Sequence, residues 1–430
     1  MTVAYGFAAA TIACALFFAG CEPSRSRSEQ STAVASSARP PASVASGEGA
    51  GSRPVWLAGS AGWLRAGPRE CATSVAEQPR ALWPGRTFRD CGAGCRESPV
   101  LPGFADAVAA ELGSAARAAD GSLYLSISAR TAAEPPLFLL GTFRYGDGAP
   151  VVLVKAERCY AQFAGRASAA TFRLFPPTGR GPRSLASFEL GDAPAVRWSP
   201  REPPVDGELF DFDGGYGNLA DFSRLSIATA SANAELRVVR ESEGTLRSPV
   251  ALGARVFWLE WDGARGGVAL LEPGQAPLTL VSREAYPVRL AVSDERIVWL
   301  AATGAGAAEG RYDSARLYGC AFAAGGRTCV VNDELELSVQ GSTGPLLTFG
   351  TNAAFTGCSS ERCDVYVIDL AAGAVRRVLG ESGLELRVLG LTRSELLVAV
   401  QTGATRGSAD FDRLRSYELA RFADFSTRVR

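Results

Sequence analysis

A hairpin pattern recurs along the C-terminal half of the chain and narrows the folds open to it. Each instance consists of an apolar strand, a glycine-containing turn and a second apolar strand. The instances are VALLEPGQAPLTLV (268–281), LYGCAFAAGGRTCVV (317–331) and VYVIDLAAGAVRRVL (365–379). Their turn glycines, Gly274, Gly325 and Gly373, recur at intervals of about 50 residues, within the range of propeller repeats. Short strands joined by tight turns predict an all-β protein.

A second hairpin precedes the first two of these segments and follows the third. Its members are PVALGARVFWLEW (249–261), PVRLAVSDERIVWLAAT (287–303) and LRVLGLTRSELLVAVQT (386–402). Two hairpins per period give four strands per repeat, and one four-stranded sheet cannot bury both of its faces. Radial packing of several such sheets solves this problem and leaves only short edges. We therefore predict a β-propeller.

The propeller is expected to occupy residues 55–430. Dividing roughly 375 residues by a period of about 50 gives about seven four-stranded blades, and six to eight are compatible with the repeat. The N-terminal half follows the pattern less closely, and its stretch 104–120 has the composition of a helix. The alternative fold is a β-sandwich with a smaller second domain.

The first 54 residues are expected to lie outside the propeller. Residues 1–20 carry no charge, and their apolar stretch of about 15 residues predicts a signal peptide, because a spanning helix needs roughly 20. Residues 21–54 are rich in Ser, Ala, Gly and Pro with almost no bulky apolar side chains, which predicts a disordered tether.

The residues Phe18-Ala19-Gly20-Cys21 resemble the lipobox of bacterial lipoproteins. This resemblance implies that Cys21 is acylated, becomes the mature N-terminus and anchors the protein to a membrane. Together with the repeat region 245–402, these lipobox-like residues make the chain similar to uncharacterised propeller lipoproteins of Gram-negative bacteria. That group is distantly similar to WD40-like and TolB-like propellers. Glu22 is not the aspartate associated with inner-membrane retention, so we expect an exported outer-membrane lipoprotein that faces the periplasm or the cell surface.

Eight cysteines remain beyond Cys14 and Cys21, and an even count in an exported protein favours disulfides. Two pairs are suggested by short turns between cysteines, a third by a glycine loop, and the last by elimination. The expected pairs are Cys320 with Cys329, Cys358 with Cys363, Cys91 with Cys95, and Cys71 with Cys159. The alternative, a four-cysteine metal site, lacks the usual two-residue spacing.

Missing residue types exclude several reaction classes. The chain has no histidine, which removes Ser-His-Asp catalysis and histidine-ligated zinc. Its single lysine, Lys155, follows Val154 instead of the glycine that a Walker loop requires. A net charge of -1 argues against nucleic acid as a partner.

Two groups of residues suggest ligand chemistry. Asp211 and Asp213 alternate beside a glycine-rich turn and form a weak calcium candidate, with a solvated acidic loop as the alternative; no other cofactor is expected. The aromatic residues could stack on sugar rings or belong to the blade core. They are Trp258, Trp261, Trp299 and Tyr286.

These observations favour a lipid-anchored propeller that serves as a binding or scaffolding module at the cell envelope. The expected ligand is an envelope protein or a glycan, and no catalysis is assumed. Carboxylates are the only plentiful acid/base groups, so the alternative is a carboxylate-dependent glycan hydrolase or lyase on the same scaffold.

Overall fold

Strands account for almost all of the chain that the computed structural model describes. The described residues are 63–65, 73–81, 88–92, 94–99, 107–112, 116–117, 123–131, 137–145, 151–156, 160–163, 170–175, 184–188, 196–199, 207–212, 215–229, 237–304, 307, 314–322, 328–359, 362–378, 384–402 and 413–421. The predicted signal peptide, Cys21 and the predicted tether lie outside these residues.

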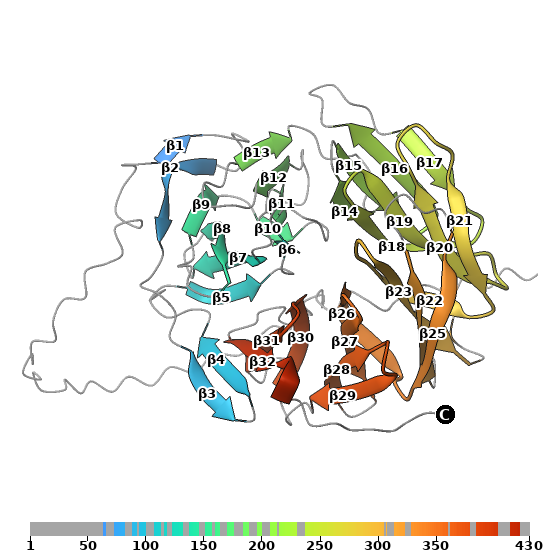
Figure 1. Cartoon of the computed structure of the whole chain (residues 1–430). Coiled ribbons are helices and arrows are strands. Elements are labelled where there is room, and N and C mark those ends of the chain that lie inside the picture. Colours follow the sequence, from blue (N-terminus) through green and yellow to red (C-terminus); the bar gives the residue numbers. More distant parts are fainter. Residues whose placement is uncertain are drawn as a thin grey trace, which may run out of the picture. The chain divides into compact units, whose positions relative to one another are not determined.

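Five sheets are four-stranded antiparallel meanders in strict chain order (Figure 1). The first two comprise β10 (Tyr160–Phe163), β11 (Ala170–Phe175), β12 (Ser184–Phe188) and β13 (Val196–Ser199), and then β14 (Gly207–Phe212), β15 (Gly215–Ala220), β16 (Arg224–Thr229) and β17 (Arg237–Glu241). The next two comprise β18 (Thr245–Leu252), β19 (Arg255–Trp261), β20 (Gly266–Leu271) and β21 (Leu278–Arg283), and then β22 (Tyr286–Val292), β23 (Arg296–Thr303), β24 (Ser314–Ala321) and β25 (Val330–Leu337). The last comprises β26 (Gly341–Phe349), β27 (Asn352–Cys358), β28 (Cys363–Asp369) and β29 (Ala374–Val378). The predicted four strands per repeat are thus present.

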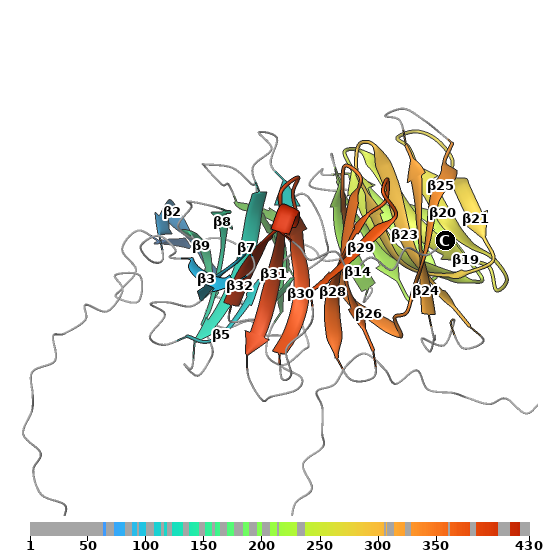
Figure 2. The same cartoon turned by 60° about the horizontal axis from the view of Figure 1, so that its bottom comes forward.

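Two further sheets depart from this simple order. The first runs β1 (Trp63–Arg65), β2 (Thr73–Ala81), β9 (Val151–Ala156), β8 (Phe138–Arg144), β7 (Leu123–Thr131) and β5 (Ala107–Leu112), with β6 (Ala116–Arg117) paired to β7. The second runs β3 (Arg89–Gly92), β4 (Cys95–Pro99), β32 (Arg413–Glu418), β31 (Glu395–Thr402) and β30 (Leu384–Leu391) (Figure 2). It joins strands from the two ends of the described chain.

The helix expected over 104–120 is wrong, because this stretch forms β5 and β6. β5 pairs with β7 over most of its length, and Leu112 is fully buried. Pairing and burial outweigh the helix propensity of its alanines, which is worth only tenths of a kcal/mol per residue. The one helix among the described residues is a 3-10 turn, Leu419–Arg421, and no described helix is long and apolar enough to cross a membrane.

The first strands of consecutive sheets lie against one another. β14 contacts β18, β18 contacts β22, β22 contacts β26, and β26 contacts β30. Four-stranded meanders that pack through their first strands are the building pattern of β-propellers. The described chain is therefore all-β and propeller-like.

Apolar side chains fill the space between consecutive sheets. Successive residues of β19 point to opposite faces, so Trp258 packs with Phe210 of β14, whereas Phe257 packs with Trp299 of β23. The exposed fractions of Trp258, Trp299 and Tyr286 are 0%, 1% and 5%. Sugar stacking is therefore wrong for these three side chains, and the core interpretation is right; Trp261 is half-buried.

Three disulfides join the cysteines that the turn positions suggested. They are Cys91–Cys95, Cys320–Cys329 and Cys358–Cys363, with Cα–Cα distances of 5.1, 5.6 and 3.9 Å. Cys71 and Cys159 lie outside the described residues. The three bonds indicate an oxidising, exported environment.

Candidate functional site

Of the two predicted calcium residues, the structure describes only Asp211. Asp211 is part of β14 and pairs with Tyr216 of β15, while Asp213 lies outside the described residues. Among the described residues, no three metal-ligating side chains are grouped closely enough to hold an ion. The calcium hypothesis stays a prediction.

A β-bulge interrupts the first strand of each C-terminal sheet. The bulges lie between Arg247 and Val250, Pro287 and Arg289, Thr343 and Leu347, and Val388 and Gly390. A bulge adds an unpaired residue, turns side chains to new directions and leaves backbone groups open to other partners. Its repetition in β18, β22, β26 and β30 makes this zone a place where neighbouring sheets interact.

Arginines occupy corresponding positions beside three of these four bulges. Arg247 pairs with Leu259, Arg289 with Leu300 and Arg387 with Ala399, while Thr343 of β26 pairs with Thr356. In all four sheets the paired residue is the fifth residue of the second strand. Three of the four first strands therefore carry an arginine at the equivalent position.

Two of these arginines bind the backbone of another sheet. Arg289 donates Nη2–H to the carbonyl oxygen of Ser342 in β26 at 3.1 Å. Arg387 donates Nη2–H to the carbonyl oxygen of Leu112 in β5. These hydrogen bonds connect sheets directly, which gives both side chains a structural role.

Arg247 has a different environment. Its guanidinium carbon lies 5.0 Å from the ring centre of Tyr286 and 5.4 Å from that of Phe222. No described residue accepts a hydrogen bond from it or forms an ion pair with it, and its Nε is buried. By contrast, Arg240 on the neighbouring β17 lies 2.7 Å from Glu260. A guanidinium has five N–H donors, so Arg247 retains unused binding capacity.

Phe222 stands at the tip of the turn that joins β15 and β16. Asp221 and Phe222 have φ values of +48° and +53°, and the N–H of Ser223 donates to the carbonyl oxygen of Ala220 at 3.0 Å. These two φ values match the central positions of a type I′ turn, whose second position favours glycine, within a three-residue connection between the paired Ala220 and Arg224. Phenylalanine is unfavourable there, yet its side chain is 56% exposed.

A surface depression of about 610 Å³ adjoins this turn. Its lining consists of Ala220, Asp221, Ser223, Arg224, Glu241, Ser242 and Glu243. Arg224 and Glu241 form an exposed ion pair at 2.7 Å, which contributes little stability. Asp221 and Glu243 have no ion-pair partner among the described residues. The depression thus offers several hydrogen-bonding groups and a small excess of negative charge.

The sequence contains a weak signal for this site that the hairpin pattern did not reveal. Asp221 and Phe222 lie where a turn with two left-handed residues favours Asp-Gly. Recognising the substitution requires knowing that three residues connect the paired Ala220 and Arg224 and that the first two have φ values above zero. Arg247 gives no sequence signal, because its aromatic neighbours come from the turn between β15 and β16 and from β22.

Comparisons with known proteins show only remote likenesses. No family model and no curated protein matches this chain. Acylaminoacyl peptidase of Pyrococcus horikoshii matches over 68% of this chain and 49% of its own, at 10% identity and a TM-score of 0.44. The present chain thus spans about half the length of that peptidase.

Two other solved structures match at similar levels. The β-propeller domain of the Trilobed protease from Pyrococcus furiosus covers 72% of this chain and 95% of its own, at 8% identity and a TM-score of 0.44. Hsv2 of Kluyvelomyces marxianus covers 69% and 89%, at 7% identity and a TM-score of 0.43. Scores this low indicate nothing about the activity of this chain.

Proposed function

We propose that this protein is an exported β-propeller of seven blades that acts as a binding module at the cell envelope. The seven sheets among the described residues support this blade number. The three disulfides support export. The lipobox-like residues before Cys21 support a lipid anchor in the outer membrane.

Phe222 carries the binding part of this proposal. A large apolar side chain in a left-handed conformation costs about 1–2 kcal/mol relative to glycine. Its ring is more than half exposed, so burial does not repay that cost. Strained residues at an exposed tip beside a depression are characteristic of ligand sites. We infer that Phe222 and the depression form the binding face.

A glycan array probed with the full-length, detergent-solubilised protein tests this function. Wild type should bind a subset of glycans, and Phe222→Gly should lose that signal at least tenfold because the stacking ring is gone. Val330→Ala is the matched control, since Val330 is an equally isolated exposed apolar residue at 69% exposure. Equal signals from wild type and Phe222→Gly would reject the assigned face, and products of cleavage would favour the glycan hydrolase or lyase.

The lipid anchor needs a separate test. Cells labelled with a palmitate analogue should incorporate label into wild type and not into Cys21→Ala. The variant should also move from the membrane fraction to the soluble fraction, because the acyl chains supply its membrane affinity. Equal label in both proteins would reject the anchor and leave the binding face unaffected.

A further inference from the structure

We propose that Phe222 and Arg247 form a subsite for a hexuronic acid residue of an oligosaccharide. The inference rests on the proposed binding function and names its ligand class. Arg247 binds the carboxylate of the sugar, and Phe222 stacks against a sugar ring.

The first argument is the state of the Arg247 guanidinium. Contacts with the rings of Phe222 and Tyr286 orient its plane, and Tyr286 is itself held by an edge contact with Trp261 at 5.3 Å. No described residue accepts its hydrogen bonds or neutralises its charge. A planar fork of donors that is fixed but unpaired is suited to bidentate binding of a carboxylate.

The second argument is the charge around Arg247. Neither β18 nor β22 contains an acidic residue. The hydroxyl of Ser248 donates to the carbonyl oxygen of Val288 at 3.3 Å, which ties the two strands together beside Arg247 and Arg289. The positive charge of Arg247, on a pair of strands without carboxylates, attracts an anionic group.

The third argument separates a sugar from an acidic peptide. The depression beside Phe222 carries Asp221 and Glu243, which repel a polyanion, and the side chains of Ser223 and Ser242, which can bond hydroxyl groups. An exposed aromatic ring suits the apolar face of a pyranose. One carboxylate on a ring rich in hydroxyls therefore fits the whole site better than a run of acidic residues.

Calorimetric titration of the full-length protein with a trisaccharide of neutral sugars that carries one glucuronic acid residue, and with the methyl ester of that trisaccharide, tests the assignment. Wild type should bind the acid at least tenfold more tightly than the ester, because charge-assisted hydrogen bonds distinguish the two. Arg247→Gln should weaken binding of the acid 10- to 100-fold and change binding of the ester less than twofold. Arg247→Lys keeps the charge and should lose part of the preference.

Arg255→Gln is the matched control. Arg255 also lies over a ring, 5.4 Å from the centre of Phe322, and has a buried nitrogen without a described partner, but it begins β19 at the opposite end of the strand from Trp261. This variant should leave both affinities unchanged. A melting curve of each variant shows whether it is folded. If Arg247→Gln does not fold, Arg247→Lys replaces it in the titration.

The outcomes separate this inference from the function on which it rests. Equal binding of acid and ester, both lost in Phe222→Gly, would keep the binding face and overturn the carboxylate assignment. Binding of neither trisaccharide would overturn the uronate ligand, while the glycan array decides the binding function. Tighter, Arg247-dependent binding of hexaglutamate would overturn the sugar assignment in favour of an acidic peptide.

Discussion

Phe222 occupies a position whose backbone conformation favours glycine. Asp221 and Phe222 both have positive φ, but only aspartate is a residue type that tolerates the left-handed region well. The residue therefore reduces stability locally while it exposes an aromatic ring beside Arg247. This conflict between local backbone preference and side-chain identity is the observation on which the proposed binding role of the turn rests.

Phe222→Gly is expected to leave the protein as stable as wild type or to raise the free energy of unfolding by up to about 1 kcal/mol. Relief of the left-handed strain, about 1–2 kcal/mol, outweighs loss of the exposed contact with Arg247, about 0.5–1 kcal/mol. Urea unfolding followed by tryptophan fluorescence measures the difference. A loss above about 1 kcal/mol would mean that Phe222 is required for the fold.

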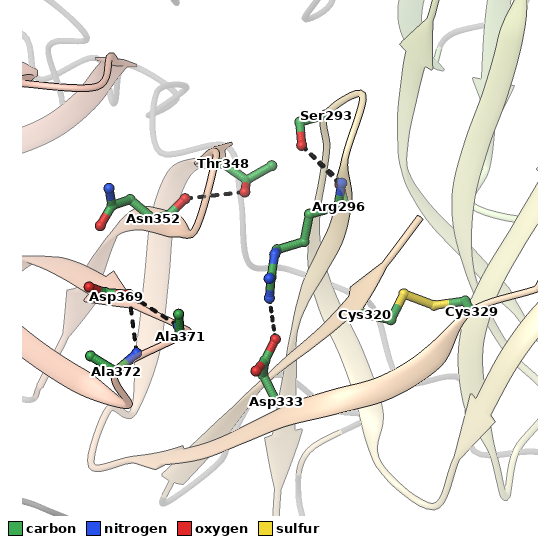
Figure 3. Close-up of polar contacts among 10 residues, drawn as sticks. All are labelled: Ser293, Arg296, Cys320, Cys329, Asp333, Thr348, Asn352, Asp369, Ala371 and Ala372. Carbon is green, nitrogen blue, oxygen red and sulfur yellow. Dashed lines mark hydrogen bonds and ion pairs between the residues drawn. A yellow bond between two sulfur atoms is a disulfide. The ribbon is translucent and has the colours of Figure 1, made fainter. Parts of the chain in front are cut away.

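Gly319 of β24 illustrates the opposite case, where glycine is required. Arg296 of β23 and Asp333 of β25 form an ion pair across this strand (Figure 3). A Cβ atom on Gly319 would lie 2.9 Å from Oδ2 of Asp333. The absence of a side chain therefore lets the carboxylate lie over the middle strand.

Gly319→Ala is expected to destabilise the protein by about 1–3 kcal/mol, because the carboxylate must move and the half-buried pair weakens. Gly341→Ala is the matched control, since a Cβ there would meet nothing closer than 3.9 Å. Chemical unfolding of both variants gives the comparison. Equal stability of the two would show that the ion pair adapts without cost.

At the scale of elements, β4 and β32 depend on a charged cluster. Arg415 donates Nε–H to Glu97 at 2.5 Å, and Arg413 donates to the other oxygen at 3.0 Å. Burial alone raises the pKa of the Glu97 carboxyl, but the hydrogen bonds and charges of Arg415 and Arg413 outweigh it and lower this pKa below its ordinary value of 4.5. Glu97 therefore stabilises the strand pair as an anion.

The sign of this pKa shift predicts acid sensitivity. A carboxyl with a lowered folded-state pKa adds stability that is complete above 4.5 and is lost as the pH falls through its folded value. Glu97→Gln should reduce the free energy of unfolding at pH 7 by about 1–3 kcal/mol, since the charge-assisted hydrogen bonds from Arg415 and Arg413 are lost. The difference between the two proteins should shrink as the pH falls below 4.5 towards the lowered pKa of Glu97. A constant difference from pH 7 to pH 3 would contradict the assignment.

At the scale of the whole molecule, the β3–β4–β32–β31–β30 sheet unites strands from the two ends of the described chain. Glu97 and Arg413 are separated by 316 residues, yet they lie on paired strands. Sheets built in this way unfold together when the shared pairing is lost. The remaining sheets are sequential and pack through their first strands.

Hydrogen exchange should therefore show one cooperative unit for β4 and β32. Their amides are expected to exchange at the same rate, and Glu97→Gln should accelerate exchange in both strands together while β22–β25 change less. Mass spectrometry of peptides from the two strands measures this. Independent acceleration of β32 alone would mean that the pairing does not couple the chain ends.

The sequence largely determined the hairpins and the disulfides that join residues close in the chain. The hairpins at 249–261 and 365–379 and the pair Cys320–Cys329 could be predicted because each depends on contacts between residues close in the chain. Only the tertiary structure decided that residues 104–120 form strands, that β4 joins β32, and that Arg247 meets Phe222 and Tyr286. These features depend on which distant segments pair and where bulges turn the side chains, and such partners leave no periodic trace in the residues themselves.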